Sequence, residues 1–144
     1  MPIVAGYNRG EDKADIVVGG AELIIDPKTF ERFNSVLTGV IVPRPIAFVS
    51  TVSPDGEANL APYSFFNAVS YSTIVFSSSR NVGNKSKDTL RNIEKTKEFV
   101  CNVATWKLRD QVNESSAALD PKTNEFHTVG LEAIPSYMVK VPRV

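Results

Sequence analysis

A segment near the middle of this 144-residue chain concentrates hydroxyl and basic side chains. It follows the apolar run 73–76 and contains three serines, three basic residues and one threonine: Ser77, Ser78, Ser79, Arg80, Lys85, Lys87 and Thr89. Hydroxyl groups and a guanidinium that emerge together from the end of a buried strand suit an anion better than a protein core. The segment therefore predicts an anion-binding site.

The helix expected next in the chain strengthens this prediction. Ser86 is a favourable N-cap, and residues 87–96 form a helix in which Leu90 and Ile93 share one face. Its first turn would offer free backbone N–H groups and the positive end of the helix dipole. Residues 80–97 carry six basic and two acidic side chains, a local charge of +4 in a neutral chain. Charge alone leaves two interpretations open, a site for a phosphate-bearing ligand or a solvated helix whose charges serve solubility.

The elements that must position this site are mostly strands. Residues 46–53 are rich in β-branched and aromatic side chains, which predicts a strand buried on both faces. The turn sequence Ser-Pro-Asp-Gly at 53–56 predicts a hairpin with 57–64 as the returning strand, and 73–79 as the third strand. The same criteria predict helices at 27–36 and 106–113, and strands at 38–42, 99–104, 131–134 and 137–141.

Three motifs in this order carry a resemblance to a known family. They are PRPIAFVST at 43–51, NLAPYSFFNAVS at 59–70 and KDTLRNI at 87–93, with weaker matches at 26–40, 124–131 and 141–144. The chain resembles the flavin reductase-like, FMN-binding split-barrel flavoproteins. The resemblance implies a mainly β fold with short helices, in the form of a Greek-key six-stranded split barrel. It also implies FMN bound near a homodimer interface and redox chemistry with NAD(P)H.

The resemblance also assigns residues to the cofactor. The flavin ring and ribityl chain would be lined by residues of the first two motifs: Ser50, Thr51, Ser64, Phe65, Phe66, Asn67 and Ala68. The phosphate would be held by Ser77, Ser78, Arg80, Lys87 and Thr89, the segment that the charge argument indicated independently. We expect Asp88 to turn toward Arg91 or a backbone N–H group, and at least one of Phe65 and Phe66 to be ordinary core.

Arg44 lies between two prolines, which hold it in an extended conformation. Such an arginine would meet a ligand or a partner subunit, or it is an exposed residue in a turn. His127 is the only histidine. A His/Cys metal cluster therefore cannot be assembled within one chain. His127 could act as a general acid–base or contact a nicotinamide, but a surface hydrogen bond is the commoner role for such a histidine.

Length and composition predict one domain over 26–144 preceded by an N-terminal arm at 1–25. Zero net charge and a pI near 6.6 indicate neither a nucleic-acid nor an anionic-membrane partner. The single cysteine, Cys101, excludes an intrachain disulfide and is expected to be an inert buried thiol. The N-terminus has no basic-then-apolar signal pattern, which predicts a cytoplasmic protein.

Chains of this family usually continue beyond the segment that resembles 141–144, with strands that complete the barrel. Three explanations are open: a truncated product, strands supplied by another chain, or a smaller and incomplete barrel. The leading functional hypothesis is NAD(P)H-dependent reduction of FMN, with electrons passed to oxygen, free flavin or a partner oxygenase. The alternative is an FMN-binding or electron-carrier module without reductase activity. A polyanion-binding barrel ranks last, because residues 80–97 contain no aromatic side chain.

Overall fold

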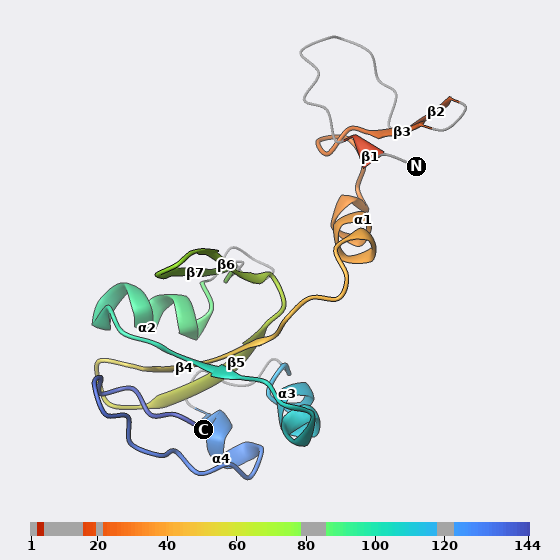
Figure 1. Cartoon of the computed structure of the whole chain (residues 1–144). Coiled ribbons are helices and arrows are strands. Elements are labelled where there is room, and N and C mark those ends of the chain that lie inside the picture. Colours follow the sequence, from red (N-terminus) through yellow and green to blue (C-terminus); the bar gives the residue numbers. More distant parts are fainter. Residues whose placement is uncertain (1–2, 5–15, 20–21, 79–85, 118–122) are drawn as a thin grey trace. The chain divides into compact units, whose positions relative to one another are not determined.

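The computed structural model describes residues 3–4, 16–19, 22–78, 86–117 and 123–144 (Figure 1). Its internal contacts divide the chain into two units, Met1–Pro43 and Arg44–Val144. The boundary predicted from the sequence, after residue 25, lies within the first unit. No helix among the described residues is long and apolar enough to cross a membrane.

The first unit contains a small sheet and one helix. Its strands are β1 (Ile3–Val4), β2 (Ile16–Gly19) and β3 (Glu22–Ile25), in the order β1-β3-β2, and helix α1 is Phe33–Val40. The predictions of a helix at 27–36 and a strand at 38–42 are therefore corrected. Asp26 does not begin the helix, because its carboxylate and carbonyl accept hydrogen bonds from Lys28 and Phe30 in a separate turn.

The second unit is built on an antiparallel sheet in the order β5-β4-β8. The strands are β4 (Ala47–Val52), β5 (Ala58–Tyr63) and β8 (Val100–Val103), close to their predicted positions. One face of β4 packs Ala47 and Val49 against Tyr63, and the other packs Phe48 against Leu60 and Phe126. The prediction of a strand buried on both faces is thus confirmed.

A tight turn joins β4 to β5 as predicted. Gly56 has φ +92°, a conformation that glycine tolerates and other residues rarely adopt. Its N–H donates to the carbonyl of Ser53 over 3.0 Å, and the Ser53 N–H donates to the carbonyl of Glu57 over 2.8 Å. The turn fixes the register of the hairpin, in which Thr51 lies opposite Asn59.

A second hairpin consists of β6 (Phe66–Ser70) and β7 (Thr73–Phe76). The sequence analysis did not predict β6, and it extended the strand that begins at residue 73 beyond Phe76. The Phe76 ring lies 5.1 Å from the Tyr63 ring and 5.3 Å from the Phe99 ring, between centroids. These contacts connect the base of the hairpin to the buried cluster of Ala47, Val49 and Tyr63, which is the first core cluster.

Helix α2 (Asp88–Thr96) packs on β4 and β5, and its N-cap is Lys87, not the predicted Ser86. Its buried residues are Thr89 and Asn92, whereas Leu90 and Ile93 are half-buried. The sheet offers two polar partners on this face, Thr51 and Asn59. Hydrogen bonding to them satisfies the polar side chains that the helix buries.

The remaining helices are η1 (Trp106–Leu108) and α3 (Arg109–Glu114), where the sequence predicted one helix, and α4 (Glu125–Thr128), which was not predicted. The predicted strands at 131–134 and 137–141 are replaced by a single bridge between Ile134 and Arg143. Within the described part of the chain, the strands of the second unit form two open sheets and do not close a barrel.

Candidate functional site

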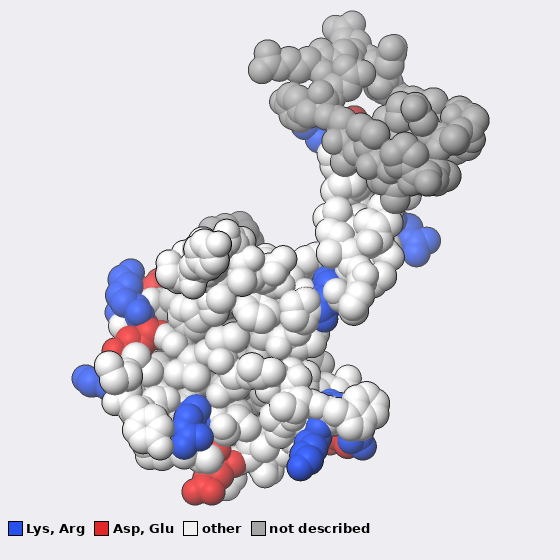
Figure 2. Space-filling view, viewed as in Figure 1, with Lys and Arg blue, Asp and Glu red and all other residues white. Residues whose placement is uncertain are grey.

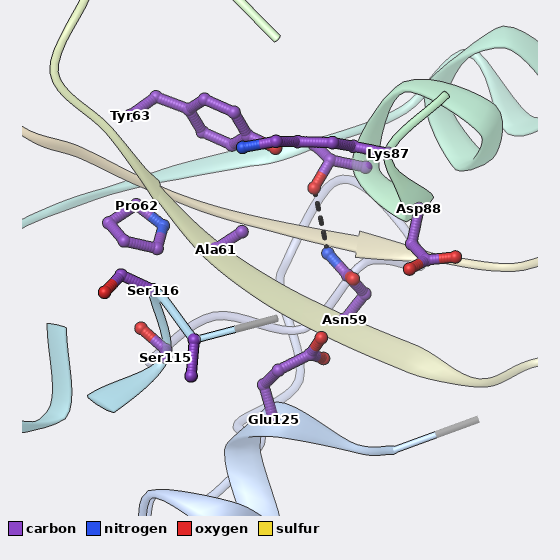
Figure 3. Close-up of a pocket in the computed structure, with 11 residues that line it drawn as sticks. Asn59, Ala61, Pro62, Tyr63, Lys87, Asp88, Ser115, Ser116 and Glu125 are labelled. Atoms are coloured by element: carbon purple, nitrogen blue, oxygen red, sulfur yellow. Dashed lines mark hydrogen bonds between the residues drawn. The ribbon is translucent and has the colours of Figure 1, made fainter. Parts of the chain in front are cut away.

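A cleft of about 240 Å³ lies where the start of α2 and the start of α4 meet strand β5 (Figure 3). Its lining also includes the segment that follows α3. The lining residues are Asn59, Ala61, Pro62, Tyr63, Lys87, Asp88, Thr89, Ser115, Ser116, Ala117 and Glu125. Two of the residues predicted to hold a phosphate, Lys87 and Thr89, are among them.

One end of the cleft is cationic. The Lys87 ammonium lies 5.2 Å from the centroid of the Tyr63 ring, so the side chain extends along that ring (Figure 3). The Tyr63 hydroxyl accepts a hydrogen bond from Ser78 over 3.4 Å. Lys87 makes no side-chain cap to α2, so the amide groups of the first helical turn add their dipole to the same end of the cleft.

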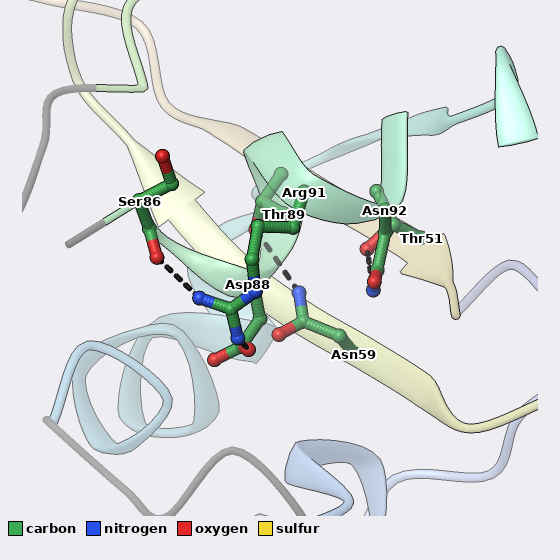
Figure 4. A network of polar contacts seen from close by, with 7 residues as sticks. All are labelled: Thr51, Asn59, Ser86, Asp88, Thr89, Arg91 and Asn92. Carbon is green, nitrogen blue, oxygen red and sulfur yellow. Dashed lines mark hydrogen bonds and ion pairs between the residues drawn. The ribbon is translucent and has the colours of Figure 1, made fainter. Parts of the chain in front are cut away.

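Asp88 does not oppose an anion here, because an ion pair neutralises it. Its carboxylate accepts from the guanidinium of Arg91, which also donates to the carbonyl of Ser86 (Figure 4). This arrangement confirms the expectation that Asp88 turns toward Arg91. Lys87 is the basic residue of the lining, and among the described residues no ion pair joins it to an acid.

The floor of the cleft is polar and contains an acid. The side-chain amide of Asn59 and the Thr89 hydroxyl form a hydrogen bond of 3.0 Å, and the N–H of Leu60 donates to the Glu125 carboxylate over 3.3 Å. Burial raises the pKa of Glu125 above its ordinary value, although hydrogen bonds from backbone N–H groups act in the opposite direction. Glu125 also covers the open edge of β5, because β5 pairs only with β4 in the described sheet.

Ser50 and Thr51, predicted to line the flavin, are fully buried and are not in the cleft lining. The Ser50 hydroxyl donates to the carbonyl of Pro142 over 2.6 Å, and it accepts from the Asn102 amide over 3.2 Å. Thr51 accepts from Asn92 over 3.1 Å (Figure 4). In this structure their hydroxyls hold the C-terminal segment and helix α2 to the sheet.

The other predicted ring contacts lie at the β6–β7 hairpin. Phe66 packs against the first core cluster, which confirms that one of the two phenylalanines is core. Phe65 is 39% exposed, and the Arg44 guanidinium lies 5.7 Å from the centroid of its ring. Ser64 is half-buried, whereas Asn67 and Ala68 are exposed. None of these residues lines the cleft.

Three further predictions concern polar residues near the site. Ser77 is exposed and Ser78 is half-buried, but Arg80 falls outside the described residues. His127 is exposed, and its backbone N–H donates to the Asn124 side chain over 3.4 Å. Among the described residues, no group of three or more His, Cys, Asp or Glu could hold a metal ion.

Sequence reasoning missed Asn59 and Glu125 as lining residues of the cleft, and it missed Asn92, whose amide holds α2 to Thr51 beside the cleft. A signal was present, because Asn59 is a polar residue at the start of an apolar strand and Asn92 lies three positions after Thr89 in the predicted helix. Glu125 follows Asn124, which is a favourable N-cap, so a short helix could have been predicted there. Its approach to β5 depends on the tertiary fold and has no local signal.

Comparison with known proteins places these residues in a family. The model of the "Flavin reductase like domain" matches residues 39–144, which is most of the chain and includes the whole of the second unit. The chain belongs to the flavin reductase-like family. The three motifs at 43–51, 59–70 and 87–93 all lie within the matched range.

Relatives and solved structures agree with this assignment. An uncharacterized protein of Aquifex aeolicus is 36% identical over 125 residues, which cover 85% of this chain and 64% of the relative. The uncharacterized protein YwrF of Bacillus subtilis is 39% identical over 109 residues, covering 75% and 53%. Nitrilotriacetate monooxygenase component B from Bacillus cereus is similar in structure, with a TM-score of 0.78 and 38% identity.

That comparison covers 87% of this chain and 63% of the Bacillus cereus protein. The 2-nitrobenzoate 2-nitroreductase NbaA of Pseudomonas fluorescens has a TM-score of 0.69 and 28% identity, with coverage of 83% and 58%. The chain therefore spans less than two thirds of the length of each of these relatives. Their similarity supports a split-barrel type of fold, mainly β with short helices.

Proposed function

We propose that this chain binds FMN and takes part in NAD(P)H-dependent flavin reduction, with electrons passed to oxygen, free flavin or a partner oxygenase. The observation that carries the proposal is the cationic end of the cleft, where Lys87 lies along Tyr63 at the uncapped start of α2. Membership of the flavin reductase-like family supports the flavin as the ligand.

The donors at this end of the cleft fit a phosphate monoester. Lys87 supplies a positive charge, and the first turn of α2 supplies backbone N–H groups. The ion pair between Asp88 and Arg91 removes the acid that would otherwise repel a phosphate. Lys87 and Thr89 would thus hold the phosphate, and Ser78 would support the cleft through Tyr63.

The rest of the cofactor would extend toward the hairpin. Phe65 offers an exposed apolar surface, and the neighbouring Ser64, Asn67 and Ala68 offer small and polar groups. When bound, FMN supplies the hydride-accepting and electron-transferring chemistry, while the protein orients it and limits access of water. Arg44, whose guanidinium lies beside the Phe65 ring, would contact a ligand or a second subunit.

The test is FMN binding by the full chain and two lysine variants. Lys87→Met keeps the aliphatic stem and removes the charge, so we expect the Kd for FMN to rise about 10- to 100-fold, the equivalent of one charged hydrogen bond. Lys95→Met, an exposed lysine on the same helix, should leave the Kd nearly unchanged. A wild-type protein that binds no FMN, measured by absorbance and fluorescence, would contradict the proposal.

A second candidate is an FMN-binding or electron-carrier module without reductase activity. The observation that favours it is the cleft lining, which offers a site for a phosphate but does not include the predicted ring contacts Ser50, Thr51 and Phe65. This candidate predicts that the FMN-loaded chain oxidises NADH and NADPH no faster than free FMN does. A faster rate, lost in Lys87→Met at subsaturating FMN, would favour the reductase.

A homodimer is the assembly we propose, with the β6–β7 hairpin in its interface. Residues 58–78 contain no Lys, Arg, Asp or Glu, and no charged side chain is visible over the hairpin in Figure 2. Its exposed apolar side chains are Val69 (60%), Ile74 (41%) and Val75 (46%). An uncharged patch can face its own copy across a two-fold axis without charge repulsion.

A partner oxygenase is the electron acceptor suggested by one structural relative. That protein is named as component B of nitrilotriacetate monooxygenase, so it is one component of an oxygenase system. For this chain the corresponding proposal is that reduced flavin is delivered to a separate oxygenase. Oxygen consumption that needs both the chain and a candidate oxygenase would support it, and equal activity without the chain would contradict it.

A further inference from the structure

Tyr63 contacts two residues that come from different elements and meet at the cationic end of the cleft. Its hydroxyl accepts a hydrogen bond from Ser78 over 3.4 Å, and the Lys87 ammonium lies 5.2 Å from the centroid of its ring (Figure 3). Ser78 follows strand β7, whereas Lys87 is the N-cap of helix α2. One side chain of β5 therefore joins the end of the hairpin to the start of the helix.

The core of the second unit fixes the position of the Tyr63 ring. The residue is 4% exposed and belongs to the buried cluster with Ala47 and Val49. The Phe76 ring packs against the Tyr63 ring at an angle of 45°, and Phe99 packs against Phe76 in turn. The Tyr63 ring is thus a fixed surface, and a side chain that contacts it takes its position from it.

Lys87 needs such a partner to remain at the cleft. It lies at the N-terminal end of α2, where the helix dipole is positive and repels a cation. The neighbouring Asp88 is paired with Arg91, and in the described part of the chain no ion pair holds the Lys87 ammonium. The face of an aromatic ring is partly negative and attracts a cation. The Tyr63 ring therefore offsets the repulsion and keeps the ammonium beside the helix start.

Burial distinguishes this contact from the other cation–π contacts of the described chain. The rings of Phe65, Trp106 and Tyr137 each lie beside an arginine, but these residues are exposed. None of them lines the cleft. A cation–π contact is stronger where water is excluded from the ring. The buried ring of Tyr63 is thus the one best suited to hold a cation in place for a ligand.

We propose that Tyr63 is a positioning residue, which holds the Lys87 ammonium at the start of α2 and thereby sets the affinity of the cleft for a phosphate group. The inference rests on the proposed function in one respect, that the phosphate is the one carried by FMN. Tyr63 acts through Lys87 and need not touch the phosphate. A lysine that is already ordered loses less side-chain freedom on binding than a mobile one, so pre-ordering raises affinity.

The experiment compares FMN with riboflavin, which lacks the phosphate, in the full wild-type chain and in Tyr63→Leu. The ratio of the two Kd values isolates phosphate binding, because the other contacts are common to both ligands. We expect the Kd for FMN to rise about 3- to 30-fold in the variant, the effect of one cation–π contact, and the Kd for riboflavin to change less than about twofold. An equal loss of affinity for both ligands would overturn the proposal, because Tyr63 would then only support the fold.

Two further variants separate the ring from the stability of the core. Tyr63→Phe keeps the ring and loses only the hydroxyl, so it should restore most of the preference for FMN over riboflavin. Phe99→Leu disturbs the same core cluster at a residue outside the cleft lining, and it should leave this preference unchanged. A Tyr63→Phe variant as weak as Tyr63→Leu, or an equal loss of preference in Phe99→Leu, would overturn the role of the ring.

A double-mutant cycle tests whether Tyr63 acts through Lys87. The ammonium is absent in Lys87→Met, so Tyr63→Leu should have no further effect on the ratio of the two Kd values in that background. An undiminished effect would overturn the proposal, because Tyr63 would then influence the phosphate by another route.

NMR of the ligand-free chain tests the contact even if FMN does not bind. The ring current of Tyr63 should shift the ε-methylene signals of Lys87 upfield of those of the exposed Lys95, in the wild type and in Tyr63→Phe but not in Tyr63→Leu. Lys87 signals that do not respond to Tyr63→Leu would overturn the proposal whatever the ligand.

Inorganic phosphate is the probe that separates this inference from the proposed function. A chain that binds no FMN, but binds inorganic phosphate more weakly in Tyr63→Leu than in the wild type, would contradict the proposed function and retain the role of Tyr63. A chain that binds neither FMN nor inorganic phosphate would overturn both.

Discussion

Strand β4 and the β6–β7 hairpin both consist largely of uncharged residues, but the fold treats them differently. Five of the six residues of β4 are buried, whereas in the hairpin only Phe66 and Phe76 are even partly buried. Strand β4 finds its partners within the chain, on both faces. The hairpin keeps apolar side chains such as Val69 on the surface, without charges to keep that surface solvated. One region stabilises the fold, and the other is available to a ligand or a partner.

The largest effect in this comparison should come from the centre of β4. Phe48 is fully buried and packs against Leu60 and Phe126, so Phe48→Ala should lower the free energy of unfolding by about 3–5 kcal/mol. Val69→Ala in the hairpin should change it by less than about 0.5 kcal/mol. Denaturant unfolding of the isolated variants measures both, and similar losses in the two would contradict the contrast.

A smaller effect should follow from the polar anchor beside β4. The Asn102 amide donates to the carbonyl of Phe48 over 2.9 Å and accepts from the Val144 N–H over 3.0 Å. Asn102→Ala leaves these groups without a side-chain partner, which should cost about 1–3 kcal/mol in unfolding free energy. Asn113→Ala, at an exposed site in α3, is the matched control and should be nearly neutral. An unchanged midpoint in the Asn102 variant would mean that water replaces its hydrogen bonds.

The hairpin itself is tested by adding a charge to it. Val75→Lys should weaken the proposed homodimer by about tenfold or more, close to 1.4 kcal/mol, because a buried charge would face its own copy. Val103→Lys at the exposed end of β8 is the control, since that valine is 78% exposed and lies outside the hairpin. Sedimentation over a concentration series measures both. If only the Val103→Lys control dissociates, the interface lies at β8 and not at the hairpin. If the wild type is a monomer, the proposed interface does not exist.

Much of the second unit could be predicted from local sequence. Residues 46–53 have the composition of a strand buried on both faces, and Gly56 has the conformational freedom that the turn needs. The prediction failed where partners distant in sequence decide the structure. Residues 131–134 have a strand-like composition, but in the described chain only the single bridge of Ile134 to Arg143 forms there. A strand needs a neighbouring edge, and local composition does not show whether one is available.

The residues of the candidate site also divide into those that local sequence predicts and those that depend on tertiary contacts. Lys87 and Thr89 could be predicted because the basic start of a helix is a local feature. Ser50 was assigned to the ligand for its motif, yet its hydroxyl is committed to the carbonyl of Pro142, far away in sequence. Glu125 was missed because its role depends on meeting β5 across the fold. Residues whose function depends on tertiary partners need the structure.

The smallest expected effect concerns Glu125, which belongs to the well-packed region but faces the cleft. Its pKa is raised above the ordinary value in the folded state, mainly by burial. The folded protein therefore binds this proton more tightly than the unfolded chain does. The resulting stabilisation is fully present below the unfolded pKa, and it is lost as the pH rises through the folded pKa.

Glu125→Gln has no such titration, so its free energy of unfolding should rise relative to that of the wild type as the pH increases from 4 to 7. Above the folded pKa the difference should level off. Unfolding curves of both proteins across this range isolate the contribution of Glu125, because all other titrating groups are shared. A difference that shrinks with rising pH would mean that hydrogen bonds from Leu60 and its neighbours outweigh burial, and that the cleft stabilises the ionised acid.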